Sequence, residues 1–273
     1  MSAAIVVLDV PPVYNPLAPP LNSCVETSMI PIHRTAIQAT RRLSQLGPTV
    51  TIPRRQPLPR TFTTTTTSKM SAISANAFLE AIKNRRSHYP LSKETPLSRE
   101  RIDEIVKEAI RHVPSSFNSQ SNRVVVLHGA EHEKFWNITT DVLKAIVPAE
   151  QWESTGGKLA MFKGAAGSIL FFEDQDVVNS FQEKFAVYAD RFPGWATQSD
   201  AMLQFTLWTA LEAEGLGANL QHYNPLVDQQ VAAEWKLPAS WKLNAQLVFG
   251  GKTGEAGPKD FKPIEEVFKS FSS

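Results

Sequence analysis

The chain has 273 residues and a formal net charge of +1 at neutral pH, and it holds a single cysteine, Cys24. One cysteine excludes disulfides within the chain, and its early position leaves the later residues without a cysteine nucleophile or cysteine zinc ligands. No block of Lys or Arg suits a nucleic-acid partner, and no apolar run reaches the roughly 18 residues of a transmembrane helix, so we expect neither nucleic-acid binding nor a membrane span.

Composition divides the chain near residue 70. Residues 1–70 hold ten of the 19 prolines, one of the 13 glycines and none of the six tryptophans. They carry seven Lys and Arg against two Asp and Glu, whereas residues 71–273 carry 21 against 25. A segment so poor in core-forming residues cannot bury enough apolar surface to fold. We therefore expect a disordered leader over 1–70 and one folded domain over 71–273.

The leader has the composition of a mitochondrial presequence. No acidic residue lies between Thr27 and Leu79, where seven Lys and Arg stand among many Ser and Thr. Residues 32–46 would form a helix with apolar residues on one face and arginines on the other. We expect a mitochondrial address if the leader is translated, from Met29 for example, and a cytoplasmic or nuclear protein if translation starts at Met70. A disordered arginine-bearing tail is the alternative, since composition alone does not show import.

Beyond the leader, hydrophobic period and capping predict helices with a few strands between them. Ser74 can cap a first helix with Phe78 on its inward face. The connections between strands are too irregular for a Rossmann alternation, so we expect an α+β fold with a single central sheet. A helix over 199–214 is apolar on every side, which is typical of a central helix or one shared with a partner subunit. The predicted helices cover residues 74–85, 98–113, 131–147, 149–162, 177–191, 199–214 and 228–235, and the predicted strands cover 123–128, 168–173, 218–222 and 246–249.

Familiar catalytic templates do not occur in this chain. It contains no GxGxxG, GxxxxGK[ST], GxSxG or HExxH pattern. His128 and His132 are four residues apart, but Gly129 lies between a predicted strand and a predicted helix there, so we expect surface or capping roles for them. The sequence therefore predicts no metal site and no side-chain nucleophile.

The first polar cluster is Asn84-Arg85-Arg86-Ser87, at the end of the first predicted helix. Two guanidinium groups beside a hydroxyl suit a phosphate, which arginine binds through paired hydrogen bonds. The alternative is a helix C-terminus with arginines that complement its dipole.

The second polar cluster is the segment Pro114–Gln120, with the sequence PSSFNSQ. It places hydroxyl and amide side chains between a strong helix and a buried strand, which hold such a loop in place. Mixed donors and acceptors suit a polyol chain or the edge of a polar ring. A turn rich in Ser and Asn is the alternative.

In this order the two clusters resemble the nitroreductase family of flavoproteins. AIKNRRS resembles the opening helix of that family, and PSSFNSQ followed by a VVVL strand resembles its Pro-Ser-Ser-x-Asn-Ser-Gln segment. LEAEGLG resembles its buried helix running into Gly-Leu-Gly, and FGGK with the later PKDFKP resembles its closing strand and C-terminal basic segment. The similarity extends from about residue 74 to 271. RRSHYPL and FGGKTGEAGPKDFKP look most like the fungal branch related to the fatty-acid-repression nitroreductase-like proteins.

The resemblance implies a central, mostly antiparallel sheet surrounded by helices, and a homodimer with FMN in each of two clefts between the subunits. Two departures from the family pattern stand out. Phe261 occupies the position of the second C-terminal basic residue, so Lys262 would substitute from one residue away. Tyr89 stands where many members have a basic residue facing flavin N1. The implied cofactor-binding residues are Arg85, Arg86 and Ser87 at the phosphate and nearby flavin, Ser115, Ser116, Asn118 and Gln120 along the ribityl chain and ring, Lys259 and Lys262 at the phosphate, and Gly250 in the closing strand.

The resemblance also implies chemistry that takes place on the flavin rather than on a catalytic side chain. NADH or NADPH would reduce the flavin in one half of a ping-pong cycle, and a nitroaromatic or quinone-type acceptor would reoxidise it in the other. Phe117, Phe192 and Trp195 are candidates to stack on a planar acceptor, with core or dimer contacts as the alternative. A flavin-binding regulatory protein of lipid or redox signalling, with little turnover, is the alternative function.

Overall fold

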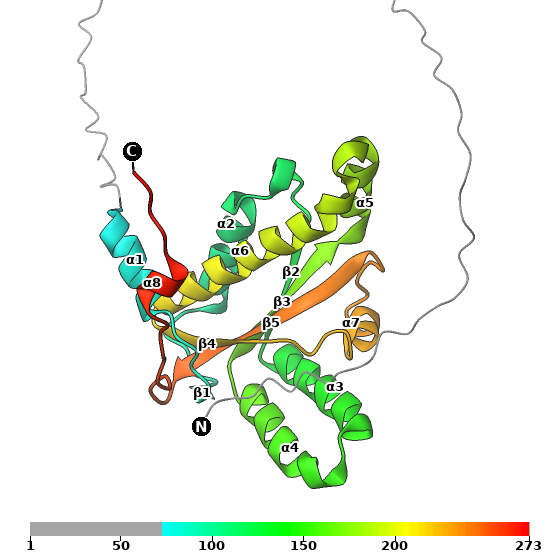
Figure 1. Cartoon of the computed structure of the whole chain (residues 1–273). Helices are drawn as coiled ribbons and strands as arrows, with labels where there is room; N and C mark the ends of the chain where they lie inside the picture. Colours follow the sequence, from blue (N-terminus) through cyan, green and yellow to red (C-terminus); the bar gives the residue numbers. More distant parts are fainter. Residues whose placement is uncertain (1–72, 273) are drawn as a thin grey trace, which may run out of the picture. The chain divides into compact units, whose positions relative to one another are not determined.

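The computed structural model describes residues 73–272, so the predicted leader and its import helix lie outside the described residues. A five-stranded sheet forms the centre of this part of the chain (Figure 1). β5 pairs with β1, β3 and β4, β2 pairs with β3, and all four pairings are antiparallel. The predicted α+β class with a mostly antiparallel sheet is confirmed. The strands are β1 (Leu91–Ser92), β2 (Asn122–His128), β3 (Gly167–Asp174), β4 (Leu216–Gln221) and β5 (Trp241–Lys252).

Helices cover both faces of the sheet. On one face α2 and α6 pack against the strands, and on the other α3, α4 and α7 do so. No helix among residues 73–272 has the length and hydrophobicity needed to cross a membrane. The helices are α1 (Ala75–Asn84), α2 (Arg99–His112), α3 (Ala130–Ile146), α4 (Ala149–Lys163), α5 (Gln175–Lys184), α6 (Phe192–Ala213), α7 (Asp228–Glu234) and α8 (Ile264–Val267), with 3-10 turns η1 (Ser116–Asn118) and η2 (Ala186–Arg191).

The sequence of the central strand β3 is a nearly continuous apolar run, and the burial of the strand explains why. Every residue from Gly167 to Asp174 is buried. Successive side chains of a strand point to opposite faces. Ile169 and Phe171 accordingly pack with α2 and α6, and Leu170 and Phe172 pack with α3 and α4. A strand covered on both faces needs apolar residues at nearly every position, as the sequence SILFFE has.

Three predicted boundaries are wrong. β5 has 12 residues rather than the four predicted, because its first half, in which polar and apolar residues alternate from Trp241, also pairs with β3, across a bulge. α6 begins at Phe192 instead of residue 199, with a proline in its first turn, where a missing N–H costs nothing. The predicted helix 177–191 is interrupted at Phe185, whose backbone is not helical (φ −125°, ψ 61°), and continues as the η2 turn.

The orientation predicted for α1 is also wrong. The helix does begin after the Ser74 cap, whose side chain accepts a hydrogen bond from the Ala77 N–H at 3.1 Å. No residue of α1 is buried, however, and the expected core residue Phe78 is 57% exposed. Its apolar face is therefore only partly covered within a single chain, with Ala81 and Ile82 half-buried.

A buried acidic cluster lies where α6 crosses the bulge between β3 and β5. Asp200 Oδ2 accepts hydrogen bonds from Gln204 Nε2 (2.7 Å) and Asn244 Nδ2 (3.1 Å), while its buried Oδ1 has no partner within residues 73–272. Asn244 also donates to Glu173 Oε1 at 2.7 Å, so one amide serves two buried carboxyl groups. Burial raises the pKa of Asp200 to about 6, against the two hydrogen bonds, which lower it, and with a further rise from the charge of Glu173.

Asp200→Asn is expected to stabilise the protein at neutral pH. Because the folded pKa of Asp200 lies above its unfolded value, its stabilising contribution is complete below about pH 4 and is lost as the pH rises through about 6. The neutral amide avoids that loss, and about two pKa units correspond to at most about 3 kcal/mol. Urea unfolding at pH 4 and pH 7.5 measures the effect. A gain in unfolding free energy of the same size at both pH values would contradict this account.

Candidate functional site

The first polar cluster lies where α1 ends against the C-terminal half of α6. Arg85 is the residue that follows the last helical turn of α1. Its guanidinium carbon lies 4.4 Å from the ring centroid of Trp208 on α6, a cation–π distance. The buried Nε of Arg85 has no hydrogen-bond partner among the described residues. A buried donor without a partner is costly, and an anionic oxygen would satisfy it.

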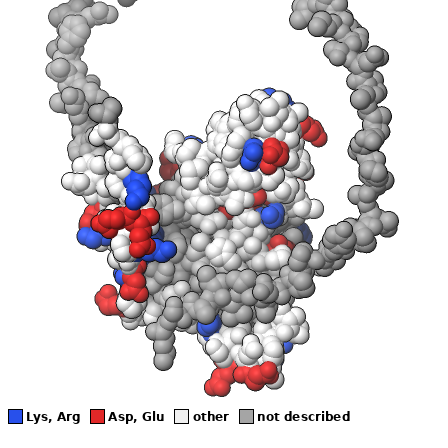
Figure 2. All heavy atoms as spheres, in the orientation of Figure 1, with Lys and Arg blue, Asp and Glu red and all other residues white. Residues whose placement is uncertain are grey.

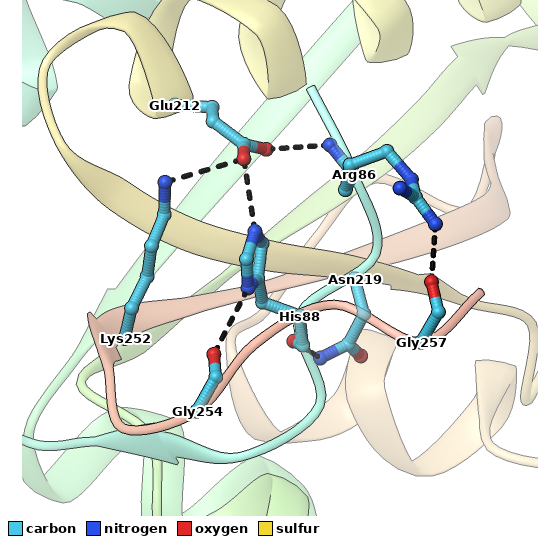
Figure 3. Close-up of polar contacts among 7 residues, drawn as sticks. All are labelled: Arg86, His88, Glu212, Asn219, Lys252, Gly254 and Gly257. Carbon is cyan, nitrogen blue, oxygen red and sulfur yellow. Dashed lines mark hydrogen bonds and ion pairs between the residues drawn. The ribbon is translucent and has the colours of Figure 1, made fainter. Parts of the chain in front are cut away.

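A buried carboxylate stands next to this cluster. Glu212, near the end of α6, accepts hydrogen bonds from the Arg86 N–H (3.0 Å) and from His88 Nε2 (3.0 Å), and Lys252 Nζ of β5 lies 3.2 Å from it (Figure 3). Asn219 Nδ2 of β4 donates to the backbone oxygen of His88 at 2.8 Å. Glu212 is thus a direct partner of Arg86, and His88, Asn219 and Lys252 belong to the same network. None of these four was singled out as a site residue from the sequence, although His88, Glu212 and Lys252 lie within the RRSHYPL, LEAEGLG and FGGK segments.

The C-terminal segment meets the same cluster, as the resemblance implied. Arg86 Nη2 donates to the carbonyl of Gly257, and His88 Nδ1 faces the carbonyl of Gly254 at 3.4 Å (Figure 3). Lys259 and Lys262 follow on the same segment and are exposed, with Lys259 Nζ 5.1 Å from the Phe261 ring. The two arginines and these two lysines therefore belong to neighbouring segments.

A cavity of about 600 Å³ opens at this junction. A second cavity, of about 570 Å³, lies between α1 and the end of α6 and shares Asn84, Glu212 and Lys252 with the first. The lining of the first is polar and consists of Asn84, Arg86, His88, Glu212, Lys252, Thr253, Gly254, Glu255 and Ala256.

The second polar cluster forms a strained turn between α2 and β2. Phe117, Asn118 and Gln120 all have positive φ, at 57°, 52° and 51°. Non-glycine residues avoid this region, and such strain gathers at functional sites. Ser115 supports the turn, since its Oγ accepts the Gln120 N–H at 2.9 Å. Ser116 N–H donates to Ser199 Oγ of α6 at 3.4 Å.

The two clusters contact different parts of α6 within one chain. The Arg85 cluster packs on Trp208, and the strained turn packs on Ser199. Nine residues of helix separate these contacts, or about 13 Å along the axis at 1.5 Å per residue. Within one chain, the arginines therefore lie next to the C-terminal segment but not next to the PSSFNSQ turn.

The three candidate stacking aromatics lie together. The Phe117 ring centroid is 5.6 Å from that of Phe192 and 5.7 Å from that of Trp195. Phe192 is only 3% exposed and belongs to a small core cluster, whereas Phe117 is 52% exposed. Phe117 is therefore the most exposed of these three rings, while Trp195 is half-buried.

Gly250 is required by close packing within the sheet. A Cβ at this position would lie 2.4 Å from the backbone oxygen of Ser92 in β1. Only glycine lets the β1 segment, which follows the Arg85 cluster, approach β5 this closely. The structure thus gives Gly250 a packing role between β1 and β5.

The two histidines considered for metal binding instead bond to neighbouring protein groups. His128 Nε2 bonds Asp103 at 3.0 Å, and His132 bonds Ser168 Oγ at 2.9 Å and the carbonyl of Phe162 at 3.1 Å. His132 is fully buried rather than on the surface or in a cap, and this burial lowers its pKa to about 4. Residues 73–272 contain no group of three or more His, Cys, Asp and Glu that could hold a metal.

Comparisons with known proteins agree on one family. Residues 82–251 match the Nitroreductase family. The putative nitroreductase HBN1 of Saccharomyces cerevisiae is 36% identical over 202 residues, which cover 73% of this chain and 100% of the yeast protein. Nitroreductase FRM2 of the same yeast is 34% identical over 186 residues, covering 67% of this chain and 92% of its own.

Solved structures give the same result. Nitroreductase CinD from Lactococcus lactis, in complex with nicotinic acid, superposes with a TM-score of 0.67 at 46% identity and covers 71% of this chain and 100% of its own. The same protein has also been solved with chloramphenicol and with 4-nitrophenol.

Proposed function

The chain belongs to the nitroreductase family of oxidoreductases, and we propose that it binds FMN and uses NADH or NADPH to reduce nitroaromatic or quinone-type acceptors. The observation that carries the proposal is the partnerless buried Nε of Arg85, beside the junction where the C-terminal segment meets the RRS segment. FMN, when bound, would supply the redox chemistry, namely oxidation of NADH or NADPH and reduction of a second substrate in a ping-pong cycle.

The residues at this junction fit the phosphate of FMN. Trp208 packs against the face of the Arg85 guanidinium, whose N–H donors lie in its plane, where an anion would bind. Arg86, Ser87, Lys259 and Lys262 stand on the two adjoining segments and add positive charge and a hydroxyl. Ser115, Ser116, Asn118 and Gln120 carry the hydroxyl and amide groups suited to the ribityl chain and the ring.

A second copy of the chain would bring the missing cluster to the arginines. Few charged side chains lie over the face that α6 crosses, whereas acidic and basic residues gather near α1 and the C-terminal segment (Figure 2). Large apolar side chains are exposed on both helices and on that segment: Phe78 and Leu79, Met202 and Phe205, and Phe261, Phe268 and Phe271. So much exposed apolar surface is typical of a subunit interface. We propose a homodimer in which each FMN lies between the arginines of one chain and the PSSFNSQ turn of the other.

The acceptor side of the cleft would present aromatic surface. Phe117 is half exposed and is backed by Phe185, Phe192 and Trp195, with ring centroids 4.9 to 5.7 Å away. Such a ring can stack on a planar substrate. CinD, whose solved ligands are small aromatic compounds, supports this choice of substrate class.

Catalytic turnover tests the proposed reaction. Purified protein, reconstituted with FMN, should oxidise many equivalents of NADH or NADPH when 4-nitrophenol or a benzoquinone is present. A control without acceptor isolates the slow oxidation by oxygen. Oxidation limited to one equivalent of nucleotide per flavin would instead support a flavin-binding regulatory protein, and a protein that retains no flavin absorbance would contradict both.

We propose a mitochondrial address for the form that includes the leader. A fluorescent fusion of residues 29–70 is expected to enter mitochondria, because the basic face of the helix predicted over 32–46 would respond to the membrane potential. Arg34→Glu, Arg41→Glu and Arg42→Glu together should leave the fusion in the cytosol, as fluorescence microscopy against a mitochondrial marker would show. If the unsubstituted fusion stays in the cytosol, the leader is not a presequence.

A further inference from the structure

Glu212 joins segments that are far apart in the sequence. Its side chain is 4% exposed, and its carboxylate accepts hydrogen bonds from the Arg86 N–H and His88 Nε2, both at 3.0 Å, and forms an ion pair with Lys252 Nζ at 3.2 Å (Figure 3). These three partners come from the loop after α1 and from the end of β5. The loop also contacts Gly254 and Gly257. One carboxylate thus fixes the loop that carries the arginines, and through that loop it reaches the segment that leads to Lys259.

A carboxylate at this place does not help an anion to bind by its own charge. It repels a phosphate, and all of its hydrogen bonds described above go to protein groups. A buried carboxylate is retained only when its partners compensate for the lost hydration. The benefit of Glu212 must therefore come from the geometry that it imposes on its partners, as supporting residues do at other binding sites.

We propose that Glu212 is a positioning residue: its contacts hold the proposed phosphate-binding segments in place relative to each other. This inference rests on the proposed FMN function. Arg85 has no ion-pair partner within 4 Å among the described residues, so its placement depends on Trp208 and on the loop that follows it. Glu212 fixes that loop at Arg86 and His88, one and three residues beyond Arg85. His88 in turn contacts the carbonyl of Gly254, so the constraint on the loop extends to the C-terminal segment.

The test compares FMN with riboflavin, which lacks only the phosphate. Glu212→Gln keeps the shape of the side chain but replaces one accepting carboxylate oxygen with an NH₂ group, which then faces the hydrogen-bond donors of the Glu212 partners. It should weaken FMN binding about tenfold, the value of one misplaced charge-assisted hydrogen bond, and leave riboflavin binding almost unchanged. Fluorescence titration of the apoprotein gives both dissociation constants. A loss shared equally by the two flavins would show a merely structural role and would overturn the inference.

Three further variants complete the test. Glu214→Gln makes the same substitution two residues on, at an exposed carboxylate that pairs with Arg101 at 2.8 Å, and should change neither constant. His88→Gln keeps Glu212 but alters its link to Gly254, and should lower the preference for FMN severalfold even if Glu212→Gln does not fold. In an Arg85→Ala background, Glu212→Gln should have little further effect on FMN, because it acts through Arg85.

The outcomes separate this inference from the proposed function. If the unsubstituted protein binds FMN no better than riboflavin, the phosphate site and the positioning role are both wrong. If the unsubstituted protein prefers FMN and both Glu212→Gln and His88→Gln keep that preference in full, only the positioning role of Glu212 is wrong.

Discussion

Arg85→Ala is expected to weaken FMN binding at least tenfold, and Arg85→Ala with Arg86→Ala about a hundredfold or more. A hydrogen bond to a charged group contributes about 1.5 to 3 kcal/mol, which corresponds to a factor of roughly 10 to 150 in affinity. Arg85 should contribute fully, because its Nε is buried without a partner and Trp208 already orients its guanidinium. Fluorescence titration of the apoprotein with FMN measures the change.

Arg101→Ala provides a matched control for the arginine variants. Arg101 lies on α2 and pairs with the exposed carboxylates of Glu104 and Glu214, so its loss removes a positive charge without touching the proposed phosphate site. FMN affinity should stay the same in this variant. Unchanged FMN binding after loss of both Arg85 and Arg86 would exclude them as phosphate ligands.

Phe78→Glu with Phe205→Glu is expected to convert the proposed dimer to monomers that release FMN. α1 packs along α6, and the rings of Phe78 and Phe205 are 57% and 38% exposed in the single chain. A twofold interface would contain each substitution twice. Each lost ring costs roughly 1.5 to 3 kcal/mol of burial, before any cost for burying the new charge. Sedimentation velocity at micromolar concentration measures the oligomeric state.

Ile146→Glu serves as the control for the interface variant. Ile146 is 50% exposed at the end of α3, on the other face of the sheet, and should tolerate a charge without any change in assembly. A doubly substituted protein that remains dimeric and retains FMN would place the interface elsewhere.

Local sequence signals predicted those elements whose packing is regular. The Ser98-capped helix and the SILFFE strand were recognisable because their apolar residues follow the period of the element and face a covered side. The full length of β5 was not recognisable, because its first half mixes polar and apolar residues and becomes a strand through its pairing with β3. The break at Phe185 depends likewise on tertiary contacts, since its ring packs 4.9 Å from that of Phe117.

The residues of the candidate site likewise fall into those that sequence motifs identified and those that they did not. Contiguous motifs such as RRS and PSSFNSQ were visible in the sequence, and the structure shows that Arg86 meets the C-terminal segment. Glu212 and Lys252 lie within the quoted LEAEGLG and FGGK segments, but those motifs do not indicate that the two side chains meet, and Asn219 lies outside them; all three act on the loop from distant elements. Phe192 was proposed for an open cleft but is buried, since a ring in an apolar stretch gives no sign of which neighbours will cover it.

A mixed dimer tests the proposed two-chain FMN site most directly. One chain would carry Arg85→Ala and Arg86→Ala, the other Ser116→Ala and Asn118→Ala, and two different affinity tags would isolate the mixed species. Each variant alone should lose FMN. If each site takes its arginines from one chain and its PSSFNSQ turn from the partner, the mixed dimer has one intact site and should bind one FMN per pair with full affinity. A mixed dimer that binds no more FMN than either parent would show that both clusters act within one chain, or that they do not share a ligand.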